Sequence, residues 1–136
     1  MSKLIHEDLS RDIIGAGMAV HNKLKPGLDE KIYERSLVIE LRRRGHEVDQ
    51  QRAFPLYYLG EMVGELIPDL IVDQKIIVDP KVVTAFVDAH IAQMTGYLAI
   101  TGLDLAILLN FKRARLEWKR VVRQTGQNEA PPDLQA

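Results

Sequence analysis

The sequence contains no cysteine and no long hydrophobic run. Without cysteine, disulfides and thiolate metal sites are excluded, and the four histidines show no paired spacing, so any bound metal ion is expected to have oxygen ligands. No apolar run approaches the ~20 residues needed to cross a bilayer. The N-terminus also lacks the charged start and apolar run of a signal peptide. We therefore expect a cytoplasmic protein with no membrane association.

A strong excess of one charge is also missing, because the formal net charge is -1. A chain with this charge has no global attraction to nucleic acid, so a polyanion would have to bind a local basic surface. Two groups of basic residues could form such a surface, although both could equally belong to an ordinary solvated face. They are Arg42, Arg43 and Arg44, and the cluster that begins with Lys112, Arg113 and Arg115 and continues to Arg123.

The chain length of 136 residues fits one domain with a single core. We expect this domain to comprise residues 1–124. Residues 125–136 contain two adjacent prolines and few apolar side chains, and are predicted to be a disordered tail.

Hydrophobic periodicity predicts an α/β protein of the α+β type. Apolar residues recur at helical spacing in three segments, Glu7–Leu24, Leu28–Arg44 and Phe86–Ile100. Strand patterns cover residues 48–52, 54–59, 62–66, 66–72, 75–83 and 103–111, with an edge strand or short helix within residues 112–123. The nearly continuous apolar run in residues 103–111 is typical of a strand covered on both faces.

Two short strings, Pro68-Asp69 and Asp79-Pro80-Lys81, flank an apolar stretch with a turn-like middle. In a β-hairpin with a three-residue turn at residues 73–75, Asp69 would lie directly opposite Asp79. Lys81 would project from the same face, because strand side chains alternate with period 2. Two acids and one lysine on one face suggest metal-assisted hydrolysis.

Metal-assisted hydrolysis at this position requires only the two aspartates, the lysine and a hard cation. Mg²⁺, or Mn²⁺ in its place, commonly uses one or two carboxylates and keeps several waters, so Asp69 and Asp79 would suffice as ligands. Lys81 could orient or deprotonate the attacking water. The alternative is a turn aspartate and a surface ion pair of no catalytic importance.

Glu30 is a further candidate, because it precedes Tyr33 by three residues and Leu37 by seven and so lies on the stripe expected to face the core. A buried carboxylate needs a partner, which a metal ion or Lys81 could provide. The alternative is a first-turn glutamate stabilised only by the helix dipole.

Three polar residues on the next predicted helix, His90, Gln93 and Tyr97, share one face. The amide of Gln93 could orient a water or a phosphate oxygen, or could bond its neighbours or solvent. His90 is interpreted as structural, since no second histidine accompanies it.

These residues carry a resemblance to a known family. The segment Gly27–Tyr33 matches the G-x-x-E-x-x-Y signature, and further segments match the same family: Ile14–Ala16, Val20-His21, Glu40–Gly45, Pro55–Tyr58 and Asn110-Phe111. From Leu9 to Arg123 the chain is similar to the GxxExxY family of the PD-(D/E)xK nuclease-like superfamily. The resemblance implies a restriction-endonuclease-like core, with helices flanking a central mixed β-sheet that contains an antiparallel meander.

The resemblance also implies roles for individual residues. Asp69 is the aspartate of "PD", and Asp79 and Lys81 are the ends of "(D/E)xK", so both aspartates are implied as metal ligands and Lys81 as the water-activating residue. Glu30 is implied as the helix carboxylate and Gln93 as the polar residue of the following helix.

The sequence departs from its relatives at Asp79-Pro80, where a glutamate and an apolar residue are more usual. Proline keeps its carbonyl, and the middle residue of the motif often contributes its backbone oxygen as a metal ligand in this superfamily. Because Pro80 lacks an N–H, a local bulge is expected there.

The expected function is a Mg²⁺-dependent nuclease that hydrolyses DNA in preference to RNA. The alternative is a catalytically inactive nuclease-like fold that binds nucleic acid or another protein. A domain of this size leaves little room for substrate recognition, so a homodimer or a protein partner could supply it.

Overall fold

A computed structural model describes residues 5–123 of the chain. The predicted tail, residues 125–136, lies outside this range, as do residues 1–4. Its helices are α1 (Glu7–Leu24), α2 (Glu30–Arg43) and α3 (Asp88–Thr101). The predicted bounds of α1 are confirmed, whereas α2 begins two residues later than predicted.

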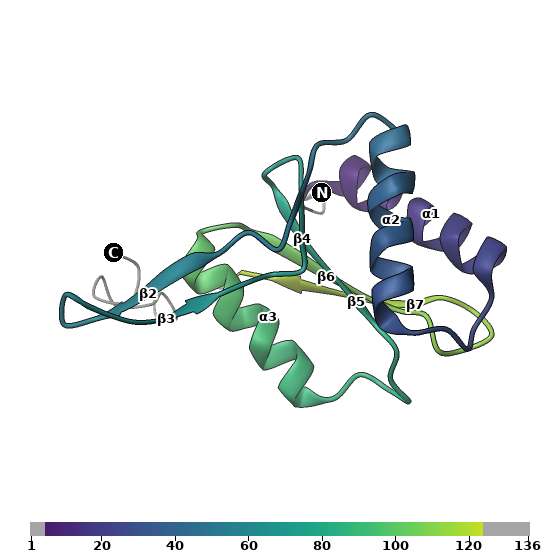
Figure 1. The fold of residues 1–136 in the computed structure, drawn as a ribbon. Coiled ribbons are helices and arrows are strands. Elements are labelled where there is room, and N and C mark those ends of the chain that lie inside the picture. Colours follow the sequence, from purple (N-terminus) through teal and green to yellow (C-terminus); the bar gives the residue numbers. More distant parts are fainter. Residues whose placement is uncertain (1–4, 124–136) are drawn as a thin grey trace, which may run out of the picture.

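The strands form a five-stranded mixed sheet and a separate two-stranded hairpin (Figure 1). The order in the larger sheet is β1-β4-β5-β6-β7, and among the described strands β2 pairs only with β3. The strands are β1 (Val48–Gln50), β2 (Phe54–Tyr58), β3 (Glu61–Leu66), β4 (Leu70–Val72), β5 (Ile76–Lys81), β6 (Leu105–Asn110) and β7 (Glu117–Val122).

Strands β1, β4 and β5 form an antiparallel meander, although the β2–β3 hairpin is inserted between β1 and β4 in the sequence. Strand β6 runs parallel to β5, so the chain must cross over between them, and α3 makes this connection. Strand β7 pairs antiparallel at the edge. The predicted restriction-endonuclease-like core, with helices flanking a central mixed sheet, is therefore confirmed.

The helices cover opposite faces of the larger sheet (Figure 1). Side chains of α1 and α2 pack with Val78 and Leu109 in one core cluster. Side chains of α3 pack with Ile77 and Leu108 in a second cluster. Because neighbouring residues of a strand project to opposite faces, Asp79 projects to the face covered by α3. Strand β6 is buried along its whole length, as predicted.

The β2–β3 hairpin projects from the body of the molecule (Figure 1). Its turn consists of Leu59 and Gly60, both with positive φ, one residue earlier than predicted. Four of its apolar side chains are more than half exposed: Tyr58, Leu59, Met62 and Val63.

The G-x-x-E-x-x-Y segment forms the turn between α1 and α2 and the start of α2. Gly27 has a φ of +110°, a conformation that favours glycine. The Tyr33 hydroxyl donates to the Lys25 carbonyl at 2.6 Å and accepts from the Leu28 N–H at 3.2 Å, and its ring stacks on Phe111 at 4.6 Å. The glycine and the tyrosine of the motif therefore stabilise the fold.

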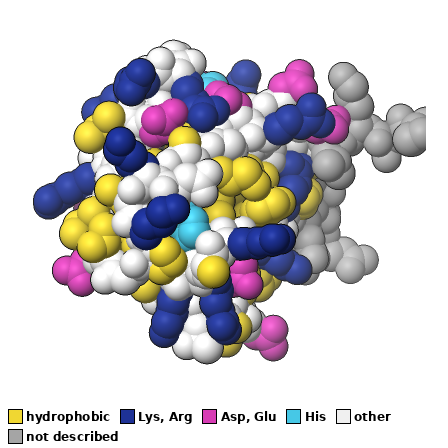
Figure 2. All heavy atoms as spheres, turned by 90° about the vertical axis from the view of Figure 1, so that its right-hand side faces the viewer, with side chains coloured by type: hydrophobic (Ala, Val, Ile, Leu, Met, Phe, Trp, Pro, Cys, Tyr) yellow, Lys and Arg dark blue, Asp and Glu magenta, His cyan; other side chains and the backbone are white. Residues whose placement is uncertain are grey.

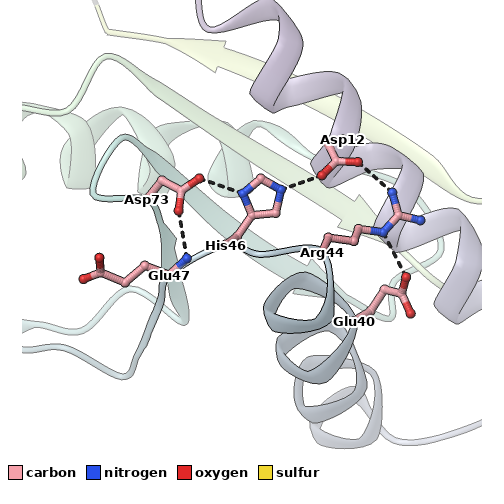
Figure 3. Close-up of polar contacts among 6 residues, drawn as sticks. All are labelled: Asp12, Glu40, Arg44, His46, Glu47 and Asp73. Carbon is pink, nitrogen blue, oxygen red and sulfur yellow. Dashed lines mark hydrogen bonds and ion pairs between the residues drawn. The ribbon is translucent and has the colours of Figure 1, made fainter.

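The tip of the β4–β5 hairpin is held by His46, which follows α2 (Figure 3). Its Nδ1 bonds to Asp73 Oδ2 at 2.7 Å, and its Nε2 bonds to Asp12 of α1. Asp73 also accepts the Glu47 N–H at 2.8 Å, and Arg44 bonds to Asp12 at 2.7 Å. We call Asp12, His46 and Asp73 the histidine clamp, because they connect α1 and the segment after α2 to the β4–β5 turn.

In the histidine clamp, the pKa of the histidine and the pKa values of the two aspartates are shifted in opposite directions. Burial lowers the pKa of His46, but its hydrogen bonds to Asp12 and Asp73 have the larger combined effect and raise it. The hydrogen bond from His46 lowers the pKa of Asp12. Burial raises the pKa of Asp73, but the hydrogen bonds from His46 and the Glu47 N–H lower it overall. The charged forms of all three groups thus favour one another.

Within residues 5–123 no helix has the length and apolar character needed to span a membrane.

Candidate active site

The β4–β5 hairpin aligns the two predicted aspartates. Leu70 pairs with Val78 and Val72 with Ile76, which leaves a three-residue turn at residues 73–75, as predicted. The same register continued by one residue sets Asp69 opposite Asp79 at the open end of the hairpin. The charge of Asp69 acts directly on the Asp79 carboxyl group, so the two side chains are close.

Asp79 is buried, with 4% of its surface exposed. Lys81 Nζ lies 3.4 Å from its Oδ2, whereas its Oδ1 has no hydrogen-bond partner among residues 5–123. Burial, followed by the proximity of Asp69, raises the pKa of Asp79 to about 8, although the positive charge of Lys81 acts to lower it. A buried carboxylate oxygen without a donor is costly, and a proton or a cation at this atom would lower that cost.

Pro80 fits into β5 without a bulge, because the pairing of β5 with β6 is continuous from Ile76 to Lys81. The expected bulge is therefore wrong. The Phe111 N–H donates to the Lys81 carbonyl at 2.9 Å, so the backbone groups of Lys81 face β6 and those of Pro80 face the opposite side. On that side β4 has ended, and the register places Pro68 opposite, which has no N–H. Pro80 therefore breaks no ladder bond, and its carbonyl faces no backbone donor.

Helix α3 brings Tyr97 and Gln93 to the pair. Burial and the negative charges of Asp79 and Asp69 raise the pKa of Tyr97, which places its hydroxyl in the electrostatic field of the two carboxylates. Gln93 Nε2 donates to the Tyr97 hydroxyl at 3.1 Å. Gln93 is thus connected to the pair through Tyr97. His90 is structural, since its Nδ1 accepts the Val87 N–H at 3.1 Å and completes the start of the helix.

The helix carboxylate that hydrogen bonds connect to this site is Glu34, not the predicted Glu30. Glu30 is exposed at the first residue of α2, so the prediction that it faces the core is wrong. One turn later Glu34 is buried, with 1% of its surface exposed. Its Oε2 accepts from Gln50 Nε2 at 2.9 Å and from Gln51 Nε2 at 3.2 Å, and Gln51 Nε2 is also 3.4 Å from Asp69 Oδ1. Gln51 therefore connects Glu34 to the aspartate pair.

In the first basic group, Arg42–Arg44, two of the three side chains make bonds within the protein. Arg44 forms ion pairs with Asp12 and Glu40, and Arg42 donates to the Val48 carbonyl at 3.0 Å. Arg43 is exposed.

The first three residues of the second group lie in the loop between β6 and β7, and the remaining residues of the group lie in or directly after β7. Lys112 Nζ donates to Thr84 Oγ1 at 3.3 Å, Arg113 donates to the Thr84 carbonyl at 2.6 Å, and Arg115 is exposed. Strands β5 and β6 are parallel, so their carboxyl ends lie at the same end of the sheet. The loop that follows β6 therefore lies at the same end of the sheet as the aspartate pair.

The described residues contain no cluster of three or more His, Asp or Glu side chains that could hold a metal ion. The two aspartates nevertheless fit an ion such as Mg²⁺, which commonly takes one or two carboxylates and fills its remaining positions with water or substrate oxygens. The Asp79 Oδ1, which has no hydrogen-bond partner among residues 5–123, agrees with such an ion.

Comparison with known proteins identifies the class. A family model described as the PD-(D/E)XK nuclease superfamily matches residues 7–121, so the chain belongs to this superfamily. No curated protein matches the chain. Among solved structures it is similar to an alkaline exonuclease from Laribacter hongkongensis, at 13% sequence identity and a TM-score of 0.47, with 79% of this chain and 76% of that chain covered. Membership rests on the family model, not on this distant similarity.

Three residues of the site were not assigned a role from the sequence: Glu34, Gln51 and Tyr97. Glu34 could have been found, since it adjoins Tyr33 on the buried side of α2. Gln51 could not, because its position depends on a left-handed backbone conformation, with φ at 59°, just after β1. Tyr97 had been placed on the correct helix face.

Proposed function

We propose that this protein is a divalent-metal-dependent nuclease that hydrolyses phosphodiesters of DNA, and less readily of RNA, at Asp69, Asp79 and Lys81. The observation that carries the proposal is the buried Asp79 carboxylate, which faces Asp69 and lies 3.4 Å from Lys81. One of its oxygens has no hydrogen-bond partner in the described part of the chain. Membership of the superfamily supports it, and the GxxExxY resemblance is the finer assignment.

Asp69 and Asp79 would hold Mg²⁺ or Mn²⁺ through their carboxylates, with the Pro80 carbonyl as a third protein ligand. When bound, the ion supplies positive charge for the phosphate and acidifies water. Binding such an ion would also remove the repulsion between the two carboxylates.

Lys81 would orient the attacking water as the ammonium, or take the proton of that water as the neutral amine. Its side chain is 15% exposed and lies beside Asp79, so its ammonium group is restrained close to the reacting position. Gln93 and Tyr97 would position a phosphate oxygen or water on the α3 side, since the Tyr97 hydroxyl experiences both carboxylate charges. Glu34 would act indirectly, by holding Gln51 against Asp69.

The basic loop between β6 and β7 would bind phosphates next to the reacting one. Lys112, Arg113 and Arg115 lie on the side of the sheet where the aspartates lie, and bonds to Thr84 order the first two. Such contacts make affinity fall with salt.

One observation favours the alternative, an inactive nuclease-like fold that binds nucleic acid or protein. The described residues provide only two carboxylates at the site, and the exposed Glu30 forms no ion pair or hydrogen bond with them. An inactive descendant would keep the fold and the basic loop but would not bind the metal ion.

Cleavage assays with linear, circular and single-stranded DNA in Mg²⁺ or Mn²⁺ distinguish the active nuclease from the inactive nuclease-like fold. The active protein is expected to lose at least ~100-fold in rate on Asp79→Asn or Lys81→Met, since each removes a group that acts on the reacting atoms. Asp8→Asn, an exposed acid on α1, is the matched control and keeps the wild-type rate. Cleavage that survives Asp79→Asn, or no cleavage by wild type in either ion, refutes the proposal.

A further inference from the structure

Trp118, the single tryptophan of the chain, lies on the edge strand β7 and is 44% exposed. It lines three surface hollows of 440, 510 and 410 Å³. The first is also lined by Met18 and Arg120, the second by Phe86 and the third by His21 and Arg115. An exposed indole between open hollows offers a flat apolar surface with space beside it.

The hollows beside Trp118 are lined by three arginines, Arg11, Arg115 and Arg120, against two carboxylates, Glu7 and Glu117. Glu7 forms an ion pair with Arg11 at 3.3 Å. Arg120 donates to Ser10 Oγ at 2.6 Å and to the Ile5 carbonyl at 2.8 Å, and forms no ion pair within residues 5–123. The same holds for Arg115 and its neighbours Lys112 and Arg113 across the part of the chain that is described. In Figure 2 the end of the molecule that carries the β6–β7 loop and the last turns of α1 faces the viewer. Lys and Arg side chains are spread around hydrophobic ones on this surface, with fewer Asp and Glu side chains.

This surface lies close to the aspartate pair in the sheet. Trp118 pairs with Leu109, which pairs with Pro80, so Trp118 is two strands from Pro80. At the usual strand spacing, this separation is about 10 Å between backbones. Trp118 projects to the face of Leu109, which α1 covers, whereas Asp79 projects to the α3 face. A chain passing around the end of the sheet would reach both.

We propose that Trp118 is a stacking site for an unpaired base of single-stranded nucleic acid, with Arg115 and Arg120 contacting its phosphates. The choice of nucleic acid rests on the proposed function, and the inference adds the form of the substrate. Base stacking on an aromatic ring together with a basic surface is the usual way that proteins bind single strands. A paired base within a duplex exposes only its edge, so the indole could not stack on its face.

Charge disfavours a second copy of the chain as the occupant. In a symmetric dimer the same patch contacts itself, so Arg115 and Arg120 would face their own positive copies. A phosphate backbone complements them.

The test uses the full chain with EDTA present, so that binding is measured without cleavage. The probe is an oligothymidylate of about twelve nucleotides. Because the chain has one tryptophan, its fluorescence reports on Trp118 alone. Stacking is expected to quench it by at least about one third, in a saturable and salt-sensitive way. No quenching, or equal competition by a duplex of the same length, overturns the inference.

Labelled-oligonucleotide anisotropy extends the test to variants. Trp118→Ala should weaken binding about tenfold, and Trp118→Phe should restore most of it. Arg115→Ala should lower the salt slope by about one. Lys75→Ala is the matched control, since Lys75 is exposed in the β4–β5 turn, at the opposite end of the hairpin from the aspartates, and binding should be unchanged. Equal binding by wild type and Trp118→Ala refutes the stacking site.

Failure of the proposed function is distinguishable from failure of this inference. Asp79→Asn is expected to bind the oligonucleotide as wild type does. Binding that needs Trp118 in a protein that cleaves nothing supports the stacking site and refutes the nuclease. Cleavage of single-stranded DNA that is indifferent to Trp118→Ala refutes the stacking site and leaves the nuclease intact.

Discussion

At the scale of single residues, the decisive group is Asp79. Its carboxylate is buried and faces another carboxylate, and within residues 5–123 one of its oxygens has no hydrogen-bond partner. Two such charges side by side repel, so the site without an ion favours a proton on Asp79. A divalent ion and a proton are thus alternative ways to neutralise the pair.

Asp79→Asn tests this neutralisation through stability. Burial and Asp69 raise the pKa of Asp79 to about 8, above its ordinary value of 3.8. Its contribution to stability is therefore complete below pH 3.8 and is lost as pH rises through about 8. In EDTA, the free energy of unfolding of wild type relative to Asp79→Asn should fall by about 4 kcal/mol between about pH 5 and about pH 9. Urea unfolding at several pH values measures it, and parallel profiles for the two proteins would contradict the interpretation.

Glu34 and Glu30 allow a paired comparison on one helix. Glu34→Gln replaces an acceptor of two glutamine amides and should lower the cleavage rate about tenfold and the free energy of unfolding by about 1–3 kcal/mol. Glu30→Gln changes an exposed side chain and should leave both within about twofold and 0.5 kcal/mol of wild type. Steady-state cleavage rates and urea unfolding of both variants measure these effects. A larger loss of activity in Glu30→Gln than in Glu34→Gln would show that Glu30 is the helix carboxylate of the site.

At the scale of elements, the β4–β5 hairpin determines the geometry of the site. Its register sets Asp69 against Asp79, and the histidine clamp holds its tip against α1 and the segment after α2. A one-residue slip in this register would move one aspartate to the other face. The clamp lies at the opposite end of the hairpin from the aspartates, so it is a structural support and contacts no reacting group.

The clamp should make stability depend on pH. The pKa of His46 is raised, so its contribution is complete below about 6.5 and is lost as pH rises through the folded value. The pKa values of Asp12 and Asp73 are lowered, so their contribution is complete above 3.8 and is lost as pH falls through the folded values. His46→Gln should therefore destabilise by about 1–2 kcal/mol near pH 5.5 and by less at about pH 8.5.

Thermal or urea unfolding of His46→Gln at the two pH values measures this difference. Asp12→Asn removes one partner of His46 and should reduce the pH dependence without abolishing it. A loss of stability that is equal at both pH values would show that the clamp is held by packing and not by charge.

The elements also show what sequence reasoning could and could not supply. Period 2 and the length of the turn were sufficient to place Asp69, Asp79 and Lys81, because a hairpin is a local structure. Helical periodicity gave the correct side of α2 but not how far along it burial begins, and so selected Glu30 instead of Glu34. The separation of β2–β3 from the larger sheet was not predictable, since alternation does not identify the partner of a strand.

At the scale of the whole molecule, the candidate functional features lie at one end of the larger sheet. The aspartate pair, the basic β6–β7 loop and Trp118 all lie where β5 and β6 end and β7 begins. The fold explains this arrangement, because the crossover through α3 makes β5 and β6 parallel and so brings their carboxyl ends together. A homodimer or protein partner stays a prediction from the size of the domain.

The central claim is that Asp69 and Asp79 form a metal site, and calorimetric titration of Mn²⁺ and Mg²⁺ into the full chain tests it most directly. Wild type is expected to bind about one ion per chain with a rise in Tm, Asp79→Asn to lose both effects, and Asp8→Asn to behave as wild type. Absence of binding by wild type, or equal binding by Asp79→Asn, would contradict the account.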